Sequence, residues 1–183
     1  MRIVIAGILG GVAMYIWSTI AHVATPLGEM GVSQLSNEQS VIAAVHGEKS
    51  GLYLFPWSTD MSEAGQKAQQ ARLDADGMGL LVYRAPGTAS VSMGRPMALE
   101  FASELLQALI AAWLLAQTAI AGFSRRVVFV TGIGAAVAIG TNVSYWIWYG
   151  FPCNYTIGYI AIQLVGYFAA GLAIAATLKR NAA

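Results

Sequence analysis

Charged residues are scarce in this chain, and their scarcity indicates its class. Only 10% of the 183 residues are Asp, Glu, Lys or Arg, whereas 57% are hydrophobic and the mean hydropathy is +0.60. Since an ordinary soluble domain carries about 25% charged residues, this composition is typical of an integral membrane protein. The formal net charge is +1 and no run of basic residues exceeds two. A nucleic-acid partner and a polybasic lipid-binding patch are therefore not expected.

Cysteine and histidine are also nearly missing. Cys153 is the only cysteine, which excludes an internal disulfide, a Cys-x-x-Cys redox centre and a cysteine-based zinc site but leaves an intermolecular disulfide open. The two histidines are His22, at the end of an apolar run, and His46, in a polar segment, so a transmembrane haem with two axial histidines is not expected. The chain also lacks a glycine-rich phosphate loop and a nucleophile with a paired base. No cofactor follows from the sequence, and whether the chain is an enzyme stays open.

Long apolar stretches dominate what is present. At about 20 residues for a hydrocarbon core of about 30 Å, each is long enough to cross a bilayer as a helix. The predicted spans are residues 1–23, 97–123, 127–148 and 155–178. The fold class predicted is therefore an α-helical integral membrane protein with a four-helix transmembrane bundle.

The first span has a rival interpretation as a secretory signal. Arg2 precedes the apolar run, and Thr19-Ile20-Ala21 could serve as a cleavage site. The 21 residues from Ile3 to Val23 carry no charge and exceed the roughly 7 to 15 residues of a signal core, which favours an uncleaved anchor.

Residues 24–96 are richer in charge, glycine and proline, and predict a small α/β domain between the first two spans. Ser36-Asn-Glu-Gln39 is typical of a capping box ahead of a helix that ends near Val45, and Glu63 to Ala75 predicts a second helix. Leu52 to Phe55 and Leu80 to Tyr83 predict short strands. So small a domain buries little surface, so we expect the helices or a partner to cover it. The side chains expected to be covered are Leu52, Leu54, Trp57, Leu80, Val82 and Tyr83.

Basic residues predict the orientation of the spans. Arg2, Arg125, Arg126, Lys179 and Arg180 flank one side of the predicted spans, whereas the short turn from Gly150 to Asn154 carries none. By the positive-inside rule both termini should be cytoplasmic, which places residues 24–96 outside the cytoplasm. The aromatic cluster Tyr145, Trp146, Trp148, Tyr149 and Phe151 then suits the outer interface.

Small residues recur at four-residue spacing within three spans. The repeats are Gly7-x-x-x-Gly11, Gly132-x-x-x-Ala136-x-x-x-Gly140 and Gly166-x-x-x-Ala170. Small side chains let helix backbones approach closely in lipid, so these repeats predict a compact bundle more than a specific dimer motif.

Three short sequence motifs resemble segments of known proteins. In this order around four spans, they resemble segments of uncharacterised bacterial inner-membrane proteins. The motifs are Pro26-Leu-Gly-Glu-Met-Gly31, Gly51-Leu-Tyr-Leu-Phe-Pro56 and Ser144-Tyr-Trp-Ile-Trp-Tyr-Gly-Phe-Pro152. The resemblance implies a bacterial inner membrane, four spans and a periplasmic domain. It implies no activity and no functional residues.

The second predicted span carries Glu100 and Glu104, the two carboxylates expected at membrane depth. A charged side chain there costs about 2.5 to 3.5 kcal/mol at the helix centre, so it usually faces the bundle interior or water. The spacing i, i+4 places both on one helix face, with Gln107 one turn further. Polar faces are also predicted in the outer halves of the other spans, formed by Tyr15, Ser18, Thr19 and His22, by Asn142, Tyr145 and Tyr149, and by Tyr159, Gln163 and Tyr167.

If these faces converge, they form an outward-facing polar cavity. Its ligand-binding candidates are Glu100, Glu104, Gln107, Asn142, Tyr145 and Gln163. A divalent metal held by His22, Glu100 and Glu104 is one hypothesis, and a cation or proton site at Glu104 with aromatic faces is another. The purely structural interpretation is that the polar groups only form hydrogen bonds across helices and fix the register of the helices.

Two functional classes therefore stay open. The leading one is a non-enzymatic accessory or stabilising subunit of a larger membrane assembly, in contact with lipids and with a protein partner or a second copy. The alternative is a small membrane receptor, transporter component or metal-binding enzyme that uses the polar cavity.

Overall fold

The computed structural model describes residues 1–178, whose contacts form two compact units. The first unit combines Met1–Val32 with the chain from Met93 onward, and the second is Ser33–Ser92. The second unit is shorter than the predicted domain of residues 24–96. The reason is that Pro26–Glu29 forms a 3₁₀ turn that packs on the helices of the first unit.

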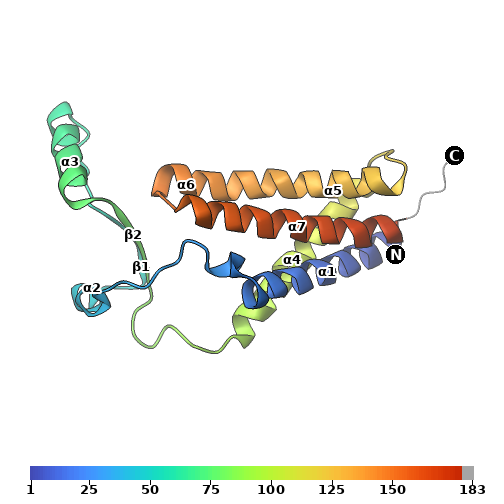
Figure 1. The fold of residues 1–183 in the computed structure, drawn as a ribbon, viewed down its shortest axis with the longest axis horizontal. Coiled ribbons are helices and arrows are strands. Elements are labelled where there is room, and N and C mark those ends of the chain that lie inside the picture. The colour runs from blue at the N-terminus through green and yellow to red at the C-terminus, as the bar shows by residue number, and fades with distance from the viewer. Residues whose placement is uncertain (179–183) are drawn as a thin grey trace. The chain divides into compact units, whose positions relative to one another are not determined.

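Within residues 1–178, four helices are long and apolar enough to cross a membrane by length and composition. They are α1 (Arg2–Ala24), α4 (Gly94–Ala116), a continuous third helix from Phe123 to Tyr149, and α7 (Cys153–Thr177). Figure 1 shows α1, α7 and the third helix running side by side.

The bounds of the middle helices differ from those that hydropathy predicts. Helix α4 begins three residues before the predicted residue 97 and ends at Ala116 instead of 123. The chain turns over residues 117–122, where Gly122 takes a φ of +86° that favours glycine, and the next helix begins at Phe123 instead of 127. That third helix consists of α5 (Phe123–Ala138), a π-helical turn (Ile139–Val143) and α6 (Ser144–Tyr149).

Helices α1 and α7 form the middle of the first unit. Helix α1 packs along both α4 and α7, and α7 also packs along α5, whereas α4 contacts α5 and α7 at few positions. Side chains from all four long helices meet in the core, which includes Ala6, Ala111, Val130, Ala170 and Ile174. The small side chains explain the close approach of the helices, as the repeats predicted.

The repeat Gly7-x-x-x-Gly11 lies where α1 meets α4. A Cβ atom at Gly7 would lie 2.8 Å from the Cα of Leu109, and one at Gly11 would lie 2.7 Å from the Cα of Leu105. Because these neighbours are backbone atoms, any larger residue would push the helices apart. On α7, Ala170 is buried, in agreement with the prediction for that repeat.

The repeat from Gly132 to Gly140 does not pack within the described chain, so that part of the prediction is wrong. A Cβ atom at either glycine would find nothing within 4 Å, and both residues are exposed. The glycine of α5 that does pack is Gly134, whose Cβ would lie 2.4 Å from the Cβ of Tyr167. The face of α5 that contacts α7 therefore contains Gly134 and not the predicted repeat from Gly132 to Gly140.

Arg126 is buried, although the sequence suggested a basic residue in a turn. It is 4% exposed, its Nε donates to the carbonyl oxygen of Ile120 at 3.2 Å, and its Nη1 donates to the carbonyl oxygen of Leu178 at the end of α7. A guanidinium suits a helix C-terminus, where backbone carbonyl groups lack partners and the helix dipole is negative. Lys179 and Arg180, named with it above, lie outside the described residues.

The second unit contains helix α2 (Glu38–Val45), strand β1 (Gly51–Phe55), helix α3 (Glu63–Asp76) and strand β2 (Gly79–Tyr83). The strands pair antiparallel with Leu52 opposite Val82, which confirms the predicted strands. The predicted capping box is wrong, since α2 begins after Asn37 and no side chain caps it. Helix α3 is capped by Ser62, which also hydrogen-bonds Asp60 and lowers the pKa of that carboxyl group.

One face of this two-stranded sheet is open. Side chains of α2 and those of Tyr53, Phe55 and Leu81 surround a hollow on the other face. On the open face, Leu52 and Val82 are 61% and 71% exposed, and Trp57 after the strand is 66% exposed. Within the described residues, three of the six side chains expected to be covered are thus largely exposed.

Candidate functional site

A cavity of about 130 Å³ lies between α1, α4 and α7. Its walls combine polar and aromatic side chains of all three helices, and it includes Glu100, Glu104, Gln107 and Gln163 among the ligand-binding candidates. The lining residues are Met14, Trp17, Ser18, His22, Glu100, Glu104, Gln107, Tyr159, Ile162, Gln163 and Gly166. Three of the four predicted polar faces therefore converge at one end of the helices.

Glu104 is the most enclosed acidic group of this cavity. Its side chain is 5% exposed, and its Oε2 is buried without a hydrogen-bond partner among the described residues. Ser18, His22 and Glu100 are the polar groups near its carboxylate. An unpartnered buried carboxylate oxygen is costly, and its neighbour Ser18 donates its hydroxyl group to the carbonyl oxygen of Tyr15 at 3.1 Å, so a further donor would stabilise Glu104.

Glu100 lies one helical turn before Glu104 and is exposed. It lines both the polar cavity and a neighbouring apolar hollow. The two glutamates give the cavity an acidic character, because no Lys or Arg is among the residues that line it. A cation is the ligand that such a cavity attracts.

His22 is held by the helix on which it lies. Its Nδ1 is 2.8 Å from the carbonyl oxygen of Ser18. Since a carbonyl oxygen only accepts, Nδ1 carries the proton, and in the neutral ring Nε2 is left as an acceptor. The ring also packs edge-on against Tyr159, with ring centroids 6.0 Å apart.

The amide side chains around the cavity already have partners for their oxygens. The Oε1 of Gln107 accepts from the hydroxyl group of Tyr167 at 3.0 Å, and the Oε1 of Gln163 accepts from the Nδ2 of Asn142 at 3.0 Å. Asn142 is 5% exposed and also donates to the carbonyl oxygen of Ala138. Asn142 therefore positions Gln163 and does not line the cavity. Such a hydrogen bond between helices is what the purely structural interpretation expects of these amides.

Tyr145 lies outside the cavity. Its ring stacks on Phe151 at 5.3 Å and contacts Tyr149 at 5.9 Å. From Phe151 the ring contacts continue through Tyr155 to Tyr159, whose centroids are 4.4 Å apart, and end at His22. An aromatic array thus links the end of the third helix to the cavity wall.

A metal at His22, Glu100 and Glu104 stays a hypothesis. The three residues line one cavity, yet among residues 1–178 no three His, Cys, Asp or Glu side chains come together closely enough to hold a metal ion. A metal would therefore require these side chains to move.

Trp17 is the wall residue that sequence reasoning missed. Its Nε1 donates to the carbonyl oxygen of Ile162 at 2.9 Å, which joins α1 to α7 and fixes the indole ring at the cavity. The available signal was its position beside Ser18 on the polar half of α1, because an indole N–H that is removed from water needs an acceptor.

Comparison with known protein families, curated proteins and solved structures finds no match to this chain, so the resemblance drawn from its three motifs stays a prediction.

Proposed function

We propose that this chain is a multi-pass protein of the bacterial inner membrane whose polar cavity binds a small cation, as a receptor or a transport component. The observation that carries the proposal is the carboxylate of Glu104, whose Oε2 is buried without a hydrogen-bond partner beside a cavity that has no Lys or Arg in its walls. A cation in the cavity offsets the cost of a carboxylate at membrane depth.

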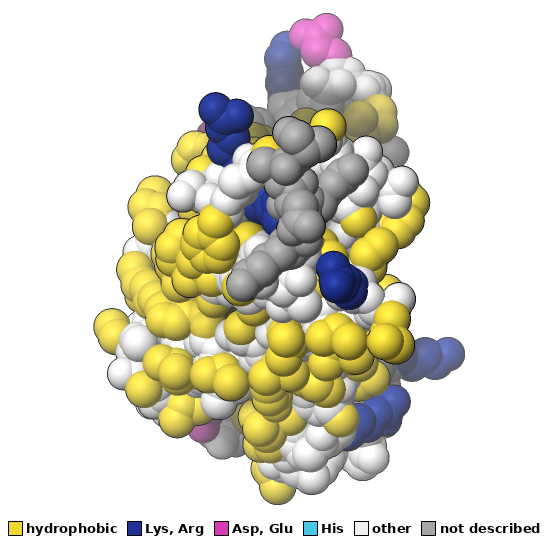
Figure 2. Space-filling view, turned by 90° about the vertical axis from the view of Figure 1, so that its right-hand side faces the viewer, with side chains coloured by type: hydrophobic (Ala, Val, Ile, Leu, Met, Phe, Trp, Pro, Cys, Tyr) yellow, Lys and Arg dark blue, Asp and Glu magenta, His cyan; other side chains and the backbone are white. Residues whose placement is uncertain are grey.

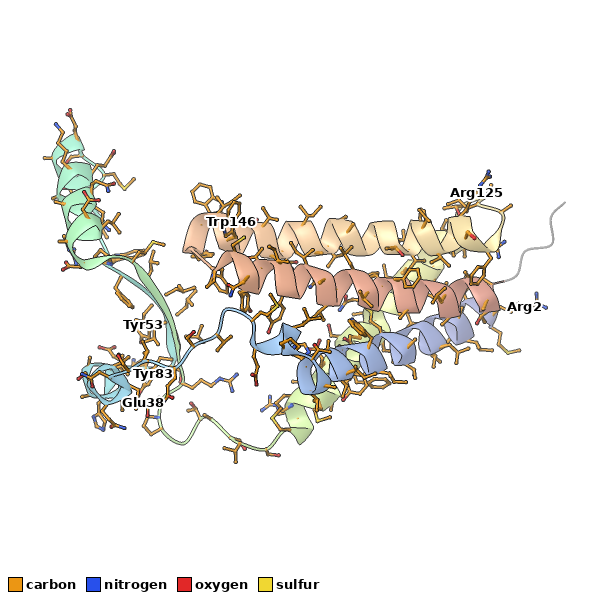
Figure 3. All side chains as sticks on the ribbon, viewed as in Figure 1. Arg2, Glu38, Tyr53, Tyr83, Arg125 and Trp146 are labelled. Atoms are coloured by element: carbon orange, nitrogen blue, oxygen red, sulfur yellow. The ribbon has the colours of Figure 1, made fainter. Side chains whose placement is uncertain are left out.

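The proposed orientation has both termini in the cytoplasm and Ser33–Ser92 in the periplasm. Figure 3 shows Arg2 and Arg125 at one end of the long helices and Trp146 at the other, and Figure 2 looks onto the end with basic side chains, which stand among hydrophobic ones. Basic residues favour the cytoplasmic side and tryptophans favour an interface. With this orientation the cavity opens toward the periplasm.

We predict opposite signals from two reporter fusions that test the orientation. A reporter active only in the cytoplasm should be active at the end of the chain and inactive at Gly87, which lies in Ser33–Ser92. A periplasmic reporter should give the reverse result. Cytoplasmic activity at Gly87 would contradict the proposed orientation.

Replacing Glu104 by Gln should weaken cation binding while preserving the shape of the side chain. Hydrogen bonds to charged groups contribute about 1.5 to 3 kcal/mol, so the affinity for methylammonium should fall by about tenfold or more. The measurement is calorimetric titration of the purified full chain in a non-ionic detergent. Glu38→Gln is the matched control, because Glu38 is exposed in the second unit and should leave binding unchanged.

An accessory or stabilising subunit is the second candidate, and the open sheet face supports it. The exposed cross-strand pair of Leu52 and Val82, with Trp57 nearby in the chain, offers an apolar surface that a protein partner or a second copy could cover. The same preparation separates the two candidates. A stoichiometric partner protein together with no methylammonium binding favours the accessory subunit over the receptor.

A further inference from the structure

A second hollow adjoins the polar cavity. It measures about 410 Å³ and shares Ser18, His22, Glu100 and Tyr159 with the cavity. The rest of its wall is mainly apolar and comes from the end of α1 and the beginning of α4: Tyr15, Thr19, Val23, Met93, Pro96 and Met97. The two spaces therefore lie side by side, a polar acidic part and a larger apolar part.

The polar part selects a ligand that donates hydrogen bonds. The side-chain oxygens of Gln107 and Gln163 each accept one hydrogen bond within the protein. The carboxylates of Glu100 and Glu104, which line the same walls, offer acceptors and no donor. An ammonium group carries donors and no acceptor, so it matches these two carboxylates. A carboxylate or a phosphate would meet the two glutamates and be repelled.

Aromatic side chains strengthen this preference for an organic cation. Trp17 and Tyr159 both line the polar part. The hydrogen bond to Ile162 on α7 fixes the Trp17 ring, and stacking on Tyr155 fixes the Tyr159 ring. Aromatic faces attract a cation within about 6 Å of the ring centre, and an alkylated ammonium keeps this attraction with less cost of dehydration than a metal ion.

We propose that the ligand is an organic ammonium ion with an apolar chain, which places its ammonium group at Glu104 and its chain in the hollow bounded by Thr19, Val23 and Met97. The inference rests on the proposed cation-binding function and adds the ligand class. The same chemistry occurs in a free alkylamine and in the amine headgroup of a phospholipid, and the experiment distinguishes these sources.

The test is calorimetric titration of the full chain in a non-ionic detergent with ethyl-, butyl- and hexylammonium. Since each buried methylene contributes about 0.8 kcal/mol, affinity should rise by up to about fourfold per methylene. Hexanol and hexanoate carry the same chain without a positive charge and should bind at least about tenfold more weakly than hexylammonium. Titration of the same compounds into protein-free micelles corrects for partition of the chain into detergent.

Two variants separate the parts of the site. Glu104→Gln should weaken every ammonium ion by a similar factor. Thr19→Phe fills the apolar hollow without touching the polar part, and should abolish the gain from ethyl- to hexylammonium while ethylammonium still binds. Retained ethylammonium binding also shows that the variant is folded.

The outcomes are distinct for the two proposals. Ethylammonium binding that depends on Glu104 but does not grow with chain length would overturn the ligand class and leave the cation-binding function standing. No binding of any ammonium ion would overturn both. In nanodiscs, displacement of hexylammonium by phosphatidylethanolamine but not by phosphatidylcholine identifies the lipid headgroup as the source, and displacement by neither identifies a free amine.

Discussion

Replacing Gly11 by Ala should destabilise the protein by about 1 to 3 kcal/mol, the usual cost of forcing an extra methyl group into a packed core. The new Cβ would lie 2.7 Å from the Cα of Leu105, and a backbone atom cannot move aside without moving α4. The cost arises even though alanine is the better helix former by about 1 kcal/mol. The measurement is equilibrium unfolding in mixed micelles with a rising fraction of denaturing detergent.

Gly132→Ala is the control for this prediction. It makes the same chemical change in another long helix, but the new Cβ has nothing within 4 Å. The helix-forming preference of alanine then acts alone, so stability should stay equal or rise by up to about 1 kcal/mol. Equal destabilisation by the two substitutions would show that α1 and α4 are not packed at Gly11 as described.

Arg126→Gln should cost about 2 to 4 kcal/mol, because a carbonyl oxygen in the turn before α5 and one at the end of α7 lose a charged donor. The guanidinium joins Ile120, before α5, to Leu178, at the end of α7, so its loss should loosen the pairing of these two helices. The same unfolding measurement applies. Cross-links between cysteines introduced near the α5 and α7 ends should also form more slowly if the pairing loosens.

Arg125→Gln supplies the comparison for Arg126. It removes the same positive charge from the same end of the helices, but Arg125 is exposed. Its effect on stability should be within about 0.5 kcal/mol, as for other surface substitutions. If both variants were equally destabilised, the loss would come from the charge and not from the hydrogen bonds.

Hydropathy predicted the existence of the long helices well, because a stretch such as Ile3 to Val23 offers no charge and no strong helix breaker. It could not place the turn after Ala116, since Ala119, Ile120 and Ala121 are as apolar as a helix interior. What ends the helix is local backbone geometry at Gln117 and Gly122, which an average over a window conceals.

The acidic part of the site could also be predicted from sequence. Glu100 and Glu104 share a face at any regular helical spacing, and both line the cavity. The third helix was misjudged because its residues were counted on an unbroken α-helix. The π-helical turn Ile139–Val143 adds a residue between the packed part of α5 and Tyr145, so Asn142 points to α7 while Tyr145 stacks elsewhere.

The hydrogen bonds between helices around Glu104 could not be predicted from the sequence. Which donors and acceptors are already occupied depends on contacts across helices, such as Tyr167 to Gln107, which are 60 residues apart in the chain. Trp17 was missed for the same reason, since its acceptor, the carbonyl oxygen of Ile162, is 145 residues away. Spacing along one helix identifies a face, whereas the free positions on that face depend on its neighbours.

The π-helical turn also bears on how this sequence can change in length. Its i to i+5 hydrogen bonding holds one residue more than an α-helical turn, so a one-residue deletion between Ile139 and Val143 can be absorbed as a regular helix. The span stays continuous, and the residues after the deletion keep about the same face of the helix, whereas the same deletion in a regular α-helix rotates them by about 100°. Related sequences with and without that residue would therefore keep the same fold and present Tyr145 and Tyr149 to the same surroundings.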